Sequence, residues 1–233
     1  SRIHAVKWLP EGEPVCIILL VHGMAEYINR YDEFANFLAQ KGVLVAGNDH
    51  LGHGNSANGK YGYFCPKEAP LVVVKDVHRL KKLVQSEHPG IPIFILGHSM
   101  GSFITRNYVL RYAKGIDGVI LSGTGTGEKS TLLFTSGLIH FMALFQGWKR
   151  RSNFINKLVF GSFNKKVLAP ETPFDWLSTD KKTVEAYVKD PECGFTFTLN
   201  GFDTLIKLIY QLLNKEELNK IPPGLPILLL SGM

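Results

Sequence analysis

A serine between two glycines is the first feature of this sequence that could do chemistry. Residues 97–101 read Gly-His-Ser-Met-Gly, directly after the apolar run Ile93–Leu96 and before apolar side chains at helical spacing. A serine hydroxyl is a poor nucleophile at neutral pH, so a catalytic serine must be held free beside a base. In a sharp strand-to-helix turn, glycines remove side chains that would collide, and the helix directs its positive end at the site. The motif therefore predicts Ser99 as a nucleophile, in a turn made with Gly97, His98 and Gly101. A chance match on a surface turn is disfavoured by the flanking strand and helix.

The tetrahedral intermediate of such a reaction needs two donors for its oxyanion, commonly backbone N–H groups. One is expected from Met100, the residue after the nucleophile. The other is expected from the loop after an earlier strand, where His22-Gly23-Met24 follows the apolar run Val15–Val21. The N–H groups of Met24 and Met100 are thus the predicted oxyanion hole. The alternative for Met24 is a core methionine without a special role.

A third polar segment, from Asp49 to Ser56, carries a carboxylate and the two imidazoles of His50 and His53. These are metal-ligand types, but two histidines in one glycine-containing turn do not readily face one ion, and no further cluster supplies the missing ligands. Hydrogen bonding within the turn is the favoured interpretation. Neither a metal nor a cofactor is expected.

The composition is that of a globular chain, with 233 residues, 45% of them hydrophobic and 20% charged. The net charge of +6 is spread over short basic doublets, which favours solvated faces over nucleic-acid binding. Cys16, Cys65 and Cys193 lie far apart without metal or redox spacing, so we expect no disulfide framework and a cytoplasmic location. The apolar stretch Leu132–Phe145 is interrupted by polar residues and falls short of the ~20 residues of a membrane span.

Short apolar runs alternate with amphipathic segments, which is the pattern of βα units around a mostly parallel sheet. The predicted fold class is accordingly α/β. Helices are expected over residues 71–87 and directly after Ser99. Strands are expected after His4 and over Val15–Val21, Val43–Ala46, Ile93–Leu96, Val119–Leu121 and Ile227–Leu230.

This rhythm breaks between Ser122 and about Asn200, a length too great for a loop. We interpret residues 123–200 as a mostly helical cap insertion over the C-terminal edge of the sheet, and residues 1–122 and 201–233 as the core. Helices are expected near Leu132–Phe145, Phe154–Phe160 and Lys181–Val188.

Several segments form a combination that is typical of one enzyme family: His22-Gly23-Met24-Ala25-Glu26, Arg30-Tyr31, Asp49-His50, Gly52-His53-Gly54, Ser56, residues 97–102, Phe174–Ser178 and Asp190–Phe195. Together they resemble the monoacylglycerol lipase and lysophospholipase branch of the α/β-hydrolases. The resemblance implies an α/β-hydrolase fold, hydrolysis of lipid carboxylic esters at Ser99, Met24 and Met100 as oxyanion donors, and a cap that receives the acyl chain. It implies a small-molecule lipid ester as substrate.

The acid and base of a catalytic triad are not found where this fold requires them, after a late strand and in the order Ser, Asp or Glu, His. After Ser99 the only histidine is His140, for which a buried core or lid role is expected. Asp175 and Asp203 follow no core strand. We therefore expect the acid and base beyond Met233, in a longer chain.

Two alternatives to a lipid esterase stay open at this point. One is a serine peptidase of the proline-iminopeptidase kind, which would need an acidic or polar subsite for a free amino terminus. The other is a ligand-binding module that keeps the turn but lacks a base. The apolar residues of 132–145 beside basic Lys149–Arg151 further predict peripheral contact with a lipid surface, with ordinary core packing as the alternative.

Overall fold

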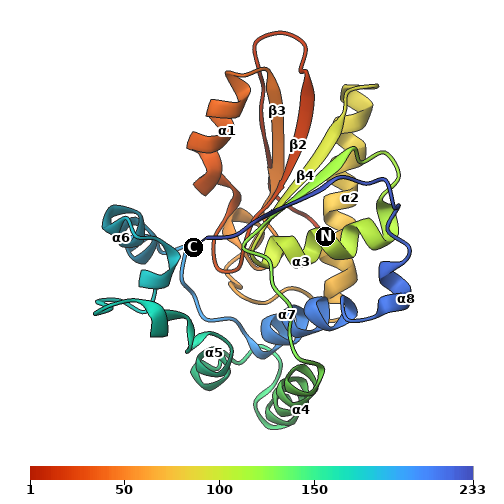
Figure 1. Ribbon diagram of the computed structural model, residues 1–233. Helices are drawn as coiled ribbons and strands as arrows, with labels where there is room; N and C mark the ends of the chain where they lie inside the picture. Colours follow the sequence, from red (N-terminus) through yellow and green to blue (C-terminus); the bar gives the residue numbers. More distant parts are fainter. Residues whose placement is uncertain (233) are drawn as a thin grey trace.

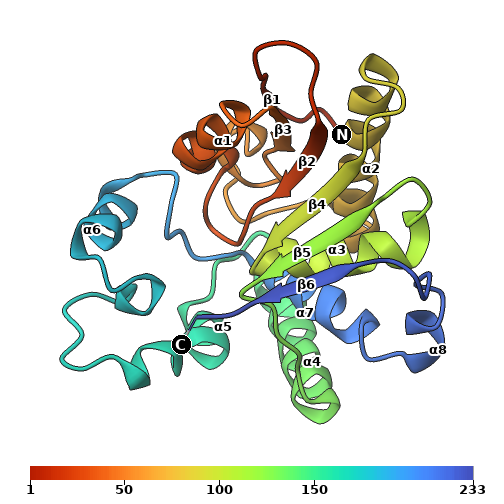
Figure 2. The ribbon, with the colours of Figure 1, turned by 45° about the horizontal axis from the view of Figure 1, so that its top comes forward.

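Six strands form one sheet in the order β1-β3-β2-β4-β5-β6 in the computed structural model, which describes residues 1–232 (Figures 1 and 2). All neighbouring strands are parallel except β1 and β3, which are antiparallel. The predicted strands and the predicted α/β class are confirmed. The strands are β1 Ala5–Trp8, β2 Cys16–Val21, β3 Val43–Asn48, β4 Ile93–His98, β5 Gly118–Ser122 and β6 Ile227–Leu230.

Helices cover both faces of this sheet (Figure 1). Helix α1 (Asp32–Ala39) lies on one face, and α2 (Ala69–Glu87) and α3 (Met100–Tyr112) lie on the other. Alternate side chains of β2 enter the two cores: Ile17 and Leu19 pack with α2 and α3, whereas Leu20 packs with α1. A strand buried on both faces needs a continuous apolar run rather than an alternating one, which explains the sequence of β2.

Between β5 and β6 the described chain forms helices that are joined by loops. They include α4 (Lys129–Gln146), α5 (Asn153–Phe160) and α6 (Lys181–Lys189), which confirm the three helices predicted there. Helix α7 (Leu199–Gln211) then packs against α2, α3 and α4, and the short α8 (Lys215–Leu218) leads to β6. Because α7 begins at Leu199, the predicted boundary at residue 200 falls inside its first turn. The division into core and cap stays a prediction.

The expected burial of His140 is wrong. The buried positions of α4 are Leu132, Thr135, Ile139 and Ala143, which fall on one face of the helix. His140 follows Ile139 by one residue and so points about 100° away from that face. Its side chain is 50% exposed and accepts or donates a 3.0 Å hydrogen bond with Asp203.

The register of the parallel strands brings the polar segments together at one edge of the sheet. Val21 of β2 lies opposite Gly97 of β4, and Leu20 lies opposite Gly47 of β3. The loops after β2, β3 and β4 therefore start side by side. Within residues 1–232, no helix has both the length and the apolarity that a membrane span requires.

Candidate active site

Ser99 occupies the turn between β4 and α3. Its backbone has φ 50° and ψ −117°, a left-handed conformation that is rare for a residue with a side chain. The Ser99 N–H donates to the carbonyl of Ser122 at the end of β5, and Ser102 N–H donates to the Ser99 carbonyl in the first turn of α3. These two bonds fix the peptide groups of Ser99, while its partly exposed side chain makes no hydrogen bond among the described residues.

The two glycines of the motif are needed for close backbone contact. A Cβ built on Gly101 would lie 1.9 Å from the carbonyl oxygen of Val21, because the first turn of α3 is packed against the end of β2. A Cβ on Gly97 would lie 2.4 Å from Oγ1 of Thr105. The turn can therefore form only when both positions lack a side chain, which is the structural reason for the Gly-x-Ser-x-Gly spacing.

The segments predicted to supply the oxyanion donors both lie next to Ser99. Met100 is the first residue of α3, so its N–H has no acceptor four residues earlier in the helix. From the other side, a Cβ built on Gly23 would lie 3.4 Å from Cβ of Ser99. The Met24 side chain is half-buried against the main core, so the group of Met24 that could bind an oxyanion is its backbone N–H. The roles of both N–H groups stay predictions.

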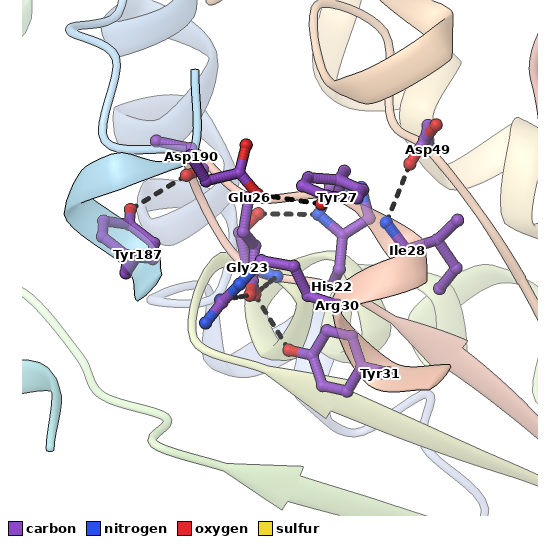
Figure 3. A network of polar contacts seen from close by, with 11 residues as sticks. His22, Gly23, Glu26, Tyr27, Ile28, Arg30, Tyr31, Asp49, Tyr187 and Asp190 are labelled. Carbon is purple, nitrogen blue, oxygen red and sulfur yellow. Dashed lines mark hydrogen bonds and ion pairs between the residues drawn. The ribbon is translucent and has the colours of Figure 1, made fainter. Parts of the chain in front are cut away.

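A buried carboxylate holds the Gly23 turn in place (Figure 3). Glu26 is 5% exposed, and its Oε1 accepts from the N–H of Gly23 at 2.5 Å and from the hydroxyl of Tyr31 at 2.9 Å. Its Oε2 accepts from Arg30 at 2.6 Å. Burial and the neighbouring Glu26 charge both raise the pKa of Tyr31, so this hydroxyl stays a donor.

Three histidines pack together behind this turn, and their partners define neutral rings. His22 Nδ1 lies 2.8 Å from the carbonyl of Gly23 and must donate to it, so His22 Nε2 is the acceptor for the N–H of His50 at 3.0 Å. His50 Nε2 lies 3.2 Å from the His22 carbonyl, and His53 Nδ1 lies 3.0 Å from the Leu51 carbonyl. Each imidazole therefore has one N–H directed at a backbone oxygen and one nitrogen that carries no proton.

Burial keeps these imidazoles uncharged. Burial is the largest cause that lowers the pKa of His50 to about 4 and of His53 to about 3, and it lowers that of His22 well below its ordinary value. The His22 and His50 rings thus join the loops after β2 and β3, whereas the His53 ring bonds within the loop after β3. No group of three or more His, Cys, Asp or Glu residues in the described part of the chain is arranged to hold a metal ion.

The in-sequence candidates for a triad lie elsewhere in the fold. His140 on α4 contacts Asp203 on α7 and the ring of Trp148, whose centroid is 5.0 Å away. Asp203 also accepts from Lys207 at 2.6 Å. Asp175 binds the N–H and hydroxyl groups of Thr172. The acid and base expected beyond Met233 lie outside the described residues.

A cavity of about 230 Å³ opens beside the nucleophile. His98, which precedes Ser99, and Glu26, which binds the Gly23 N–H, both line it. The remaining lining comes from the short 3-10 helix η1 (Ile28–Tyr31) and from the segment that contains α6: Arg30, Tyr31, Leu177, Thr183 and Tyr187. The cavity is thus bounded by polar groups on the sheet side and covered by the segment predicted as a cap.

A mostly parallel sheet with helices on both faces and a strained serine at the turn after its central strand define an α/β-hydrolase. The comparisons place the chain within this class. Residues 12–233 match the family described as "Serine aminopeptidase, S33", and the chain belongs to that family.

The relatives with curated names that the chain resembles include lipases. The chain is 40% identical over 98 residues to monoglyceride lipase of Mus musculus, covering 42% of this chain and 31% of the relative. It is 34% identical over 122 residues to monoacylglycerol lipase of Mycolicibacterium smegmatis, covering 52% and 42%. The matches thus span less than half the length of these relatives.

Solved structures give a longer match. A thermostable carboxyl esterase from Bacillus coagulans, crystallised with glycerol, superposes with a TM-score of 0.88 and 28% identity over 97% of this chain and 73% of that one. A monoglyceride lipase from Saccharomyces cerevisiae superposes with a TM-score of 0.70 at 18% identity, which shows a shared fold. The predicted resemblance to the monoacylglycerol lipase branch is confirmed.

Sequence reasoning assigned no role to several residues that the structure brings to the site. Glu26, Arg30 and Tyr31 belong to the motifs that carried the resemblance, but nothing in their spacing showed that they bind one another. The sequence offered no reason to place Tyr187 at the site, because it is separated from the Gly23 turn by more than 160 residues. Its only signal was its position beside the Asp190–Phe195 motif.

Proposed function

We propose that this protein is a serine hydrolase that cleaves carboxylic esters of lipids, monoacylglycerols or lysophospholipids, through an acyl-enzyme on Ser99. The observation that carries the proposal is the left-handed turn at Ser99, beside which the Gly23 turn lies so close that a Cβ built on Gly23 would be 3.4 Å from the Ser99 Cβ. In the proposal, the ester carbonyl carbon lies at Oγ of Ser99 and the carbonyl oxygen lies between two backbone N–H groups. The resemblance to a carboxyl esterase and to monoglyceride lipases supports an ester as the substrate.

In the proposed reaction, Oγ of Ser99 attacks the ester carbonyl and its proton passes to a general base. On this fold, chain order predicts that base to be a histidine following the late strands. The negative charge that develops on the carbonyl oxygen is received by the N–H groups of Met24 and Met100. The alcohol then leaves with a proton, and water hydrolyses the acyl-enzyme by the same steps.

Helix α4 carries exposed apolar side chains that could contact a lipid surface. Helix α4 lies at the periphery of the molecule, packed on α7 (Figures 1 and 2). Its inner residues are buried, so core packing accounts for part of its apolar sequence. Five large side chains of α4 are nevertheless 51–81% exposed: Leu133, Phe134, Phe141, Leu144 and Phe145.

The residues that follow α4 supply charge of the sign that anionic head groups attract. Lys149, Arg150 and Arg151 come directly after Gly147 and Trp148, and all three are exposed. An exposed apolar surface beside basic side chains is the combination that favours peripheral binding to a lipid aggregate. We propose that α4 contacts the aggregate that presents the substrate.

A peptidase acting on a free amino terminus is the competing reaction, and the family description makes it worth testing. Such an enzyme needs an unpaired acid for the substrate ammonium group. Glu26 is the acid that lines the cavity, but Gly23, Tyr31 and Arg30 already occupy both of its oxygens. The guanidinium of Arg30, on the same cavity, would also repel an ammonium group. These contacts favour the esterase.

Replacing Ser99 by alanine tests the function directly. Ser99→Ala keeps the Cβ that the turn already accommodates, so the fold should be retained and ester hydrolysis should fall about 10³-fold or more. Rates should be measured with p-nitrophenyl butyrate, a monoacylglycerol, a lysophospholipid and an amino-acid p-nitroanilide. Ser86→Ala on α2 is the matched control.

The outcomes separate the three functions. Activity of Ser99→Ala within tenfold of the original protein contradicts the nucleophile assignment. Turnover of the anilide above that of every ester favours the peptidase. No turnover by the full-length protein, together with no fluorophosphonate labelling of Ser99 in it, favours a ligand-binding module.

A further inference from the structure

The residue after the proposed oxyanion donor Met24 is held in an unusual conformation. Ala25 has φ 52°, which is in the left-handed region, and it is 5% exposed. A non-glycine residue keeps such a conformation only when surrounding contacts fix it. The contacts of Ala25 are therefore informative about what shapes the turn.

Those contacts come from the segment predicted as a cap, not from the sheet. The Ala25 carbonyl accepts from the Tyr187 hydroxyl at 2.9 Å and from the N–H of Gly194 at 3.0 Å. Tyr27, two residues further on, is tied to the same segment, since its hydroxyl donates to Asp190 at 2.8 Å (Figure 3). Residues 187–194 thus bind the loop after β2 at three points.

Met24 lies between two peptide groups that are both fixed. On one side the N–H of Gly23 is held by Glu26 at 2.5 Å, and on the other side the carbonyl of Ala25 is held by Tyr187. The dihedral angles of Gly23, Met24 and Ala25 lie between these two groups, and Ala25 is held at φ 52°. The Met24 N–H shares a peptide group with the Gly23 carbonyl, which accepts from His22 Nδ1 at 2.8 Å, so little freedom is left for its direction. An oxyanion donor stabilises the transition state only when it is oriented before the reaction begins.

Tyr187 is itself rigid enough to act as a support. It is 6% exposed, and the ring of Phe174 meets it edge-on at 5.2 Å. The guanidinium of Arg30 lies 4.9 Å from the centre of the Tyr187 ring while it also binds Glu26. The two supports of Met24 are therefore linked to one another through Arg30.

We propose that Tyr187 is a positioning residue, which sets the orientation of the Met24 N–H by holding the carbonyl of Ala25. This inference rests on the proposed function, and it makes helix α6 a part of the catalytic machinery rather than only a cover for substrate. Loss of the Tyr187 hydroxyl should then reduce the rate of the chemical step and leave substrate binding in place. Stability should change little, because Gly194 continues to donate to the Ala25 carbonyl.

Tyr187→Phe tests this inference, with Tyr61→Phe as the matched control. Tyr61 donates to Glu192 at 2.8 Å, so the control removes a similar hydroxyl bond to the same segment without touching the Ala25 turn. The kcat and KM for p-nitrophenyl butyrate should be measured on the intact protein, with the rate of fluorophosphonate labelling and the Tm. In Tyr187→Phe we expect kcat and the labelling rate to fall about tenfold and KM to stay within twofold, because one oxyanion donor accounts for about 10²–10³ in kcat and is misdirected here rather than lost.

Three results would overturn the inference. They are an unchanged kcat in Tyr187→Phe, a rise of KM alone, and an equal fall of kcat in Tyr61→Phe. The proposed function is judged separately, since it fails when the original protein does not hydrolyse the ester or when Ser99→Ala keeps its activity. An active original protein with an unaffected Tyr187→Phe variant therefore removes this inference and leaves the esterase intact.

Discussion

Replacing His53 by phenylalanine should change how the stability of the protein depends on pH. His53 is fully buried, and its ring lies 5.3–5.5 Å from the rings of Phe64, Phe195 and Phe197. Its Nδ1 donates to the Leu51 carbonyl, while Nε2 has no partner among the described residues. Nothing in this apolar site compensates a second proton, so burial, helped by the nearby His50, lowers the pKa of His53 to about 3.

The sign of the effect follows from where the proton binds. An unfolded chain protonates His53 below about pH 6.5, whereas the folded protein keeps the ring neutral down to about pH 3. The stability that a neutral His53 provides is therefore complete above about pH 6.5 and is lost as the pH falls toward 3. Each pH unit well inside this window costs about 1.4 kcal/mol, which amounts to about 2 kcal/mol between pH 7.5 and pH 5.

Other groups titrate in the same range, so the comparison must be made between variants. His22 and His50 act in the same direction as His53, while burial raises the pKa of Asp49 and acts in the opposite direction. The contribution of Asp49 cancels in the difference between the original protein and His53→Phe, and those of His22 and His50 cancel apart from their smaller electrostatic coupling to His53. The variant also loses the bond to Leu51, which costs about 1 kcal/mol at every pH.

Urea unfolding followed by tryptophan fluorescence at pH 7.5, 6.5 and 5 measures this difference. The free energy of unfolding of His53→Phe, relative to the original protein, should rise by about 2 kcal/mol from pH 7.5 to pH 5. Ile104→Val is the control, because it removes a buried methylene from α3 without removing a titrating group. Parallel pH profiles for His53→Phe and the original protein would refute the assignment of His53 as a neutral, buried ring.

Two further predictions concern the serine turn and helix α4. Gly101→Ala should reduce ester hydrolysis about 100-fold or more and destabilise the fold by about 1–3 kcal/mol, because its Cβ would meet the Val21 carbonyl at 1.9 Å. Gly125→Ala, where a Cβ meets nothing within 4 Å, should change neither quantity, and a fully active Gly101→Ala would contradict the close contact of α3 and β2. Phe141→Ser combined with Phe145→Ser should lower hydrolysis of a micellar long-chain ester about tenfold. The reason is that partial burial of two such rings in lipid contributes at least about 1.4 kcal/mol. The same variant should hydrolyse a soluble short-chain ester within twofold of the original rate. Phe37→Ser on α1 is the control, and equal losses on both substrates, or none on either, would contradict lipid contact. Leu138 is unsuitable for this test, because it packs against the core.

The sequence predicted those parts of the molecule whose signal is local. A strand buried on both faces needs a continuous apolar run, and β2 and β4 have one. A run of the same kind predicted β6, whose four side chains are exposed in the described part of the chain. The turn at Ser99 needs glycine at two fixed positions, so its motif is visible without any knowledge of the sheet. The helices α4, α5 and α6 were found because each has a helical spacing of apolar residues, although their bounds differed by up to three residues.

Contacts between distant side chains could not be predicted in this way. Tyr187 and Ala25 are separated by 162 residues, and only the packing of α6 on the loop after β2 brings them together. The exposure of His140 was missed for a related reason. The surrounding sequence is apolar on average, but burial is decided by the face of α4 that carries Leu132, Thr135, Ile139 and Ala143. His140 lies beside that face, where it reaches Asp203 of α7 with half of its side chain exposed.

The segment from Asp49 to Ser56 shows what such contacts add to a motif. Asp49 accepts from the N–H of Ile28 at 2.8 Å and from the N–H of Asn55 at 2.9 Å, so one carboxylate joins the loop after β2 to the loop after β3. The N–H of His50 joins the same two loops through His22, whose other nitrogen binds the Gly23 carbonyl. The Gly23 turn is therefore held by Asp49 and the histidines from one strand, by Glu26 from its own loop and by Tyr187 from α6. A turn that is fixed from three directions does not change its conformation when substrate binds. Oxyanion donors that are oriented before the reaction begins require this rigidity.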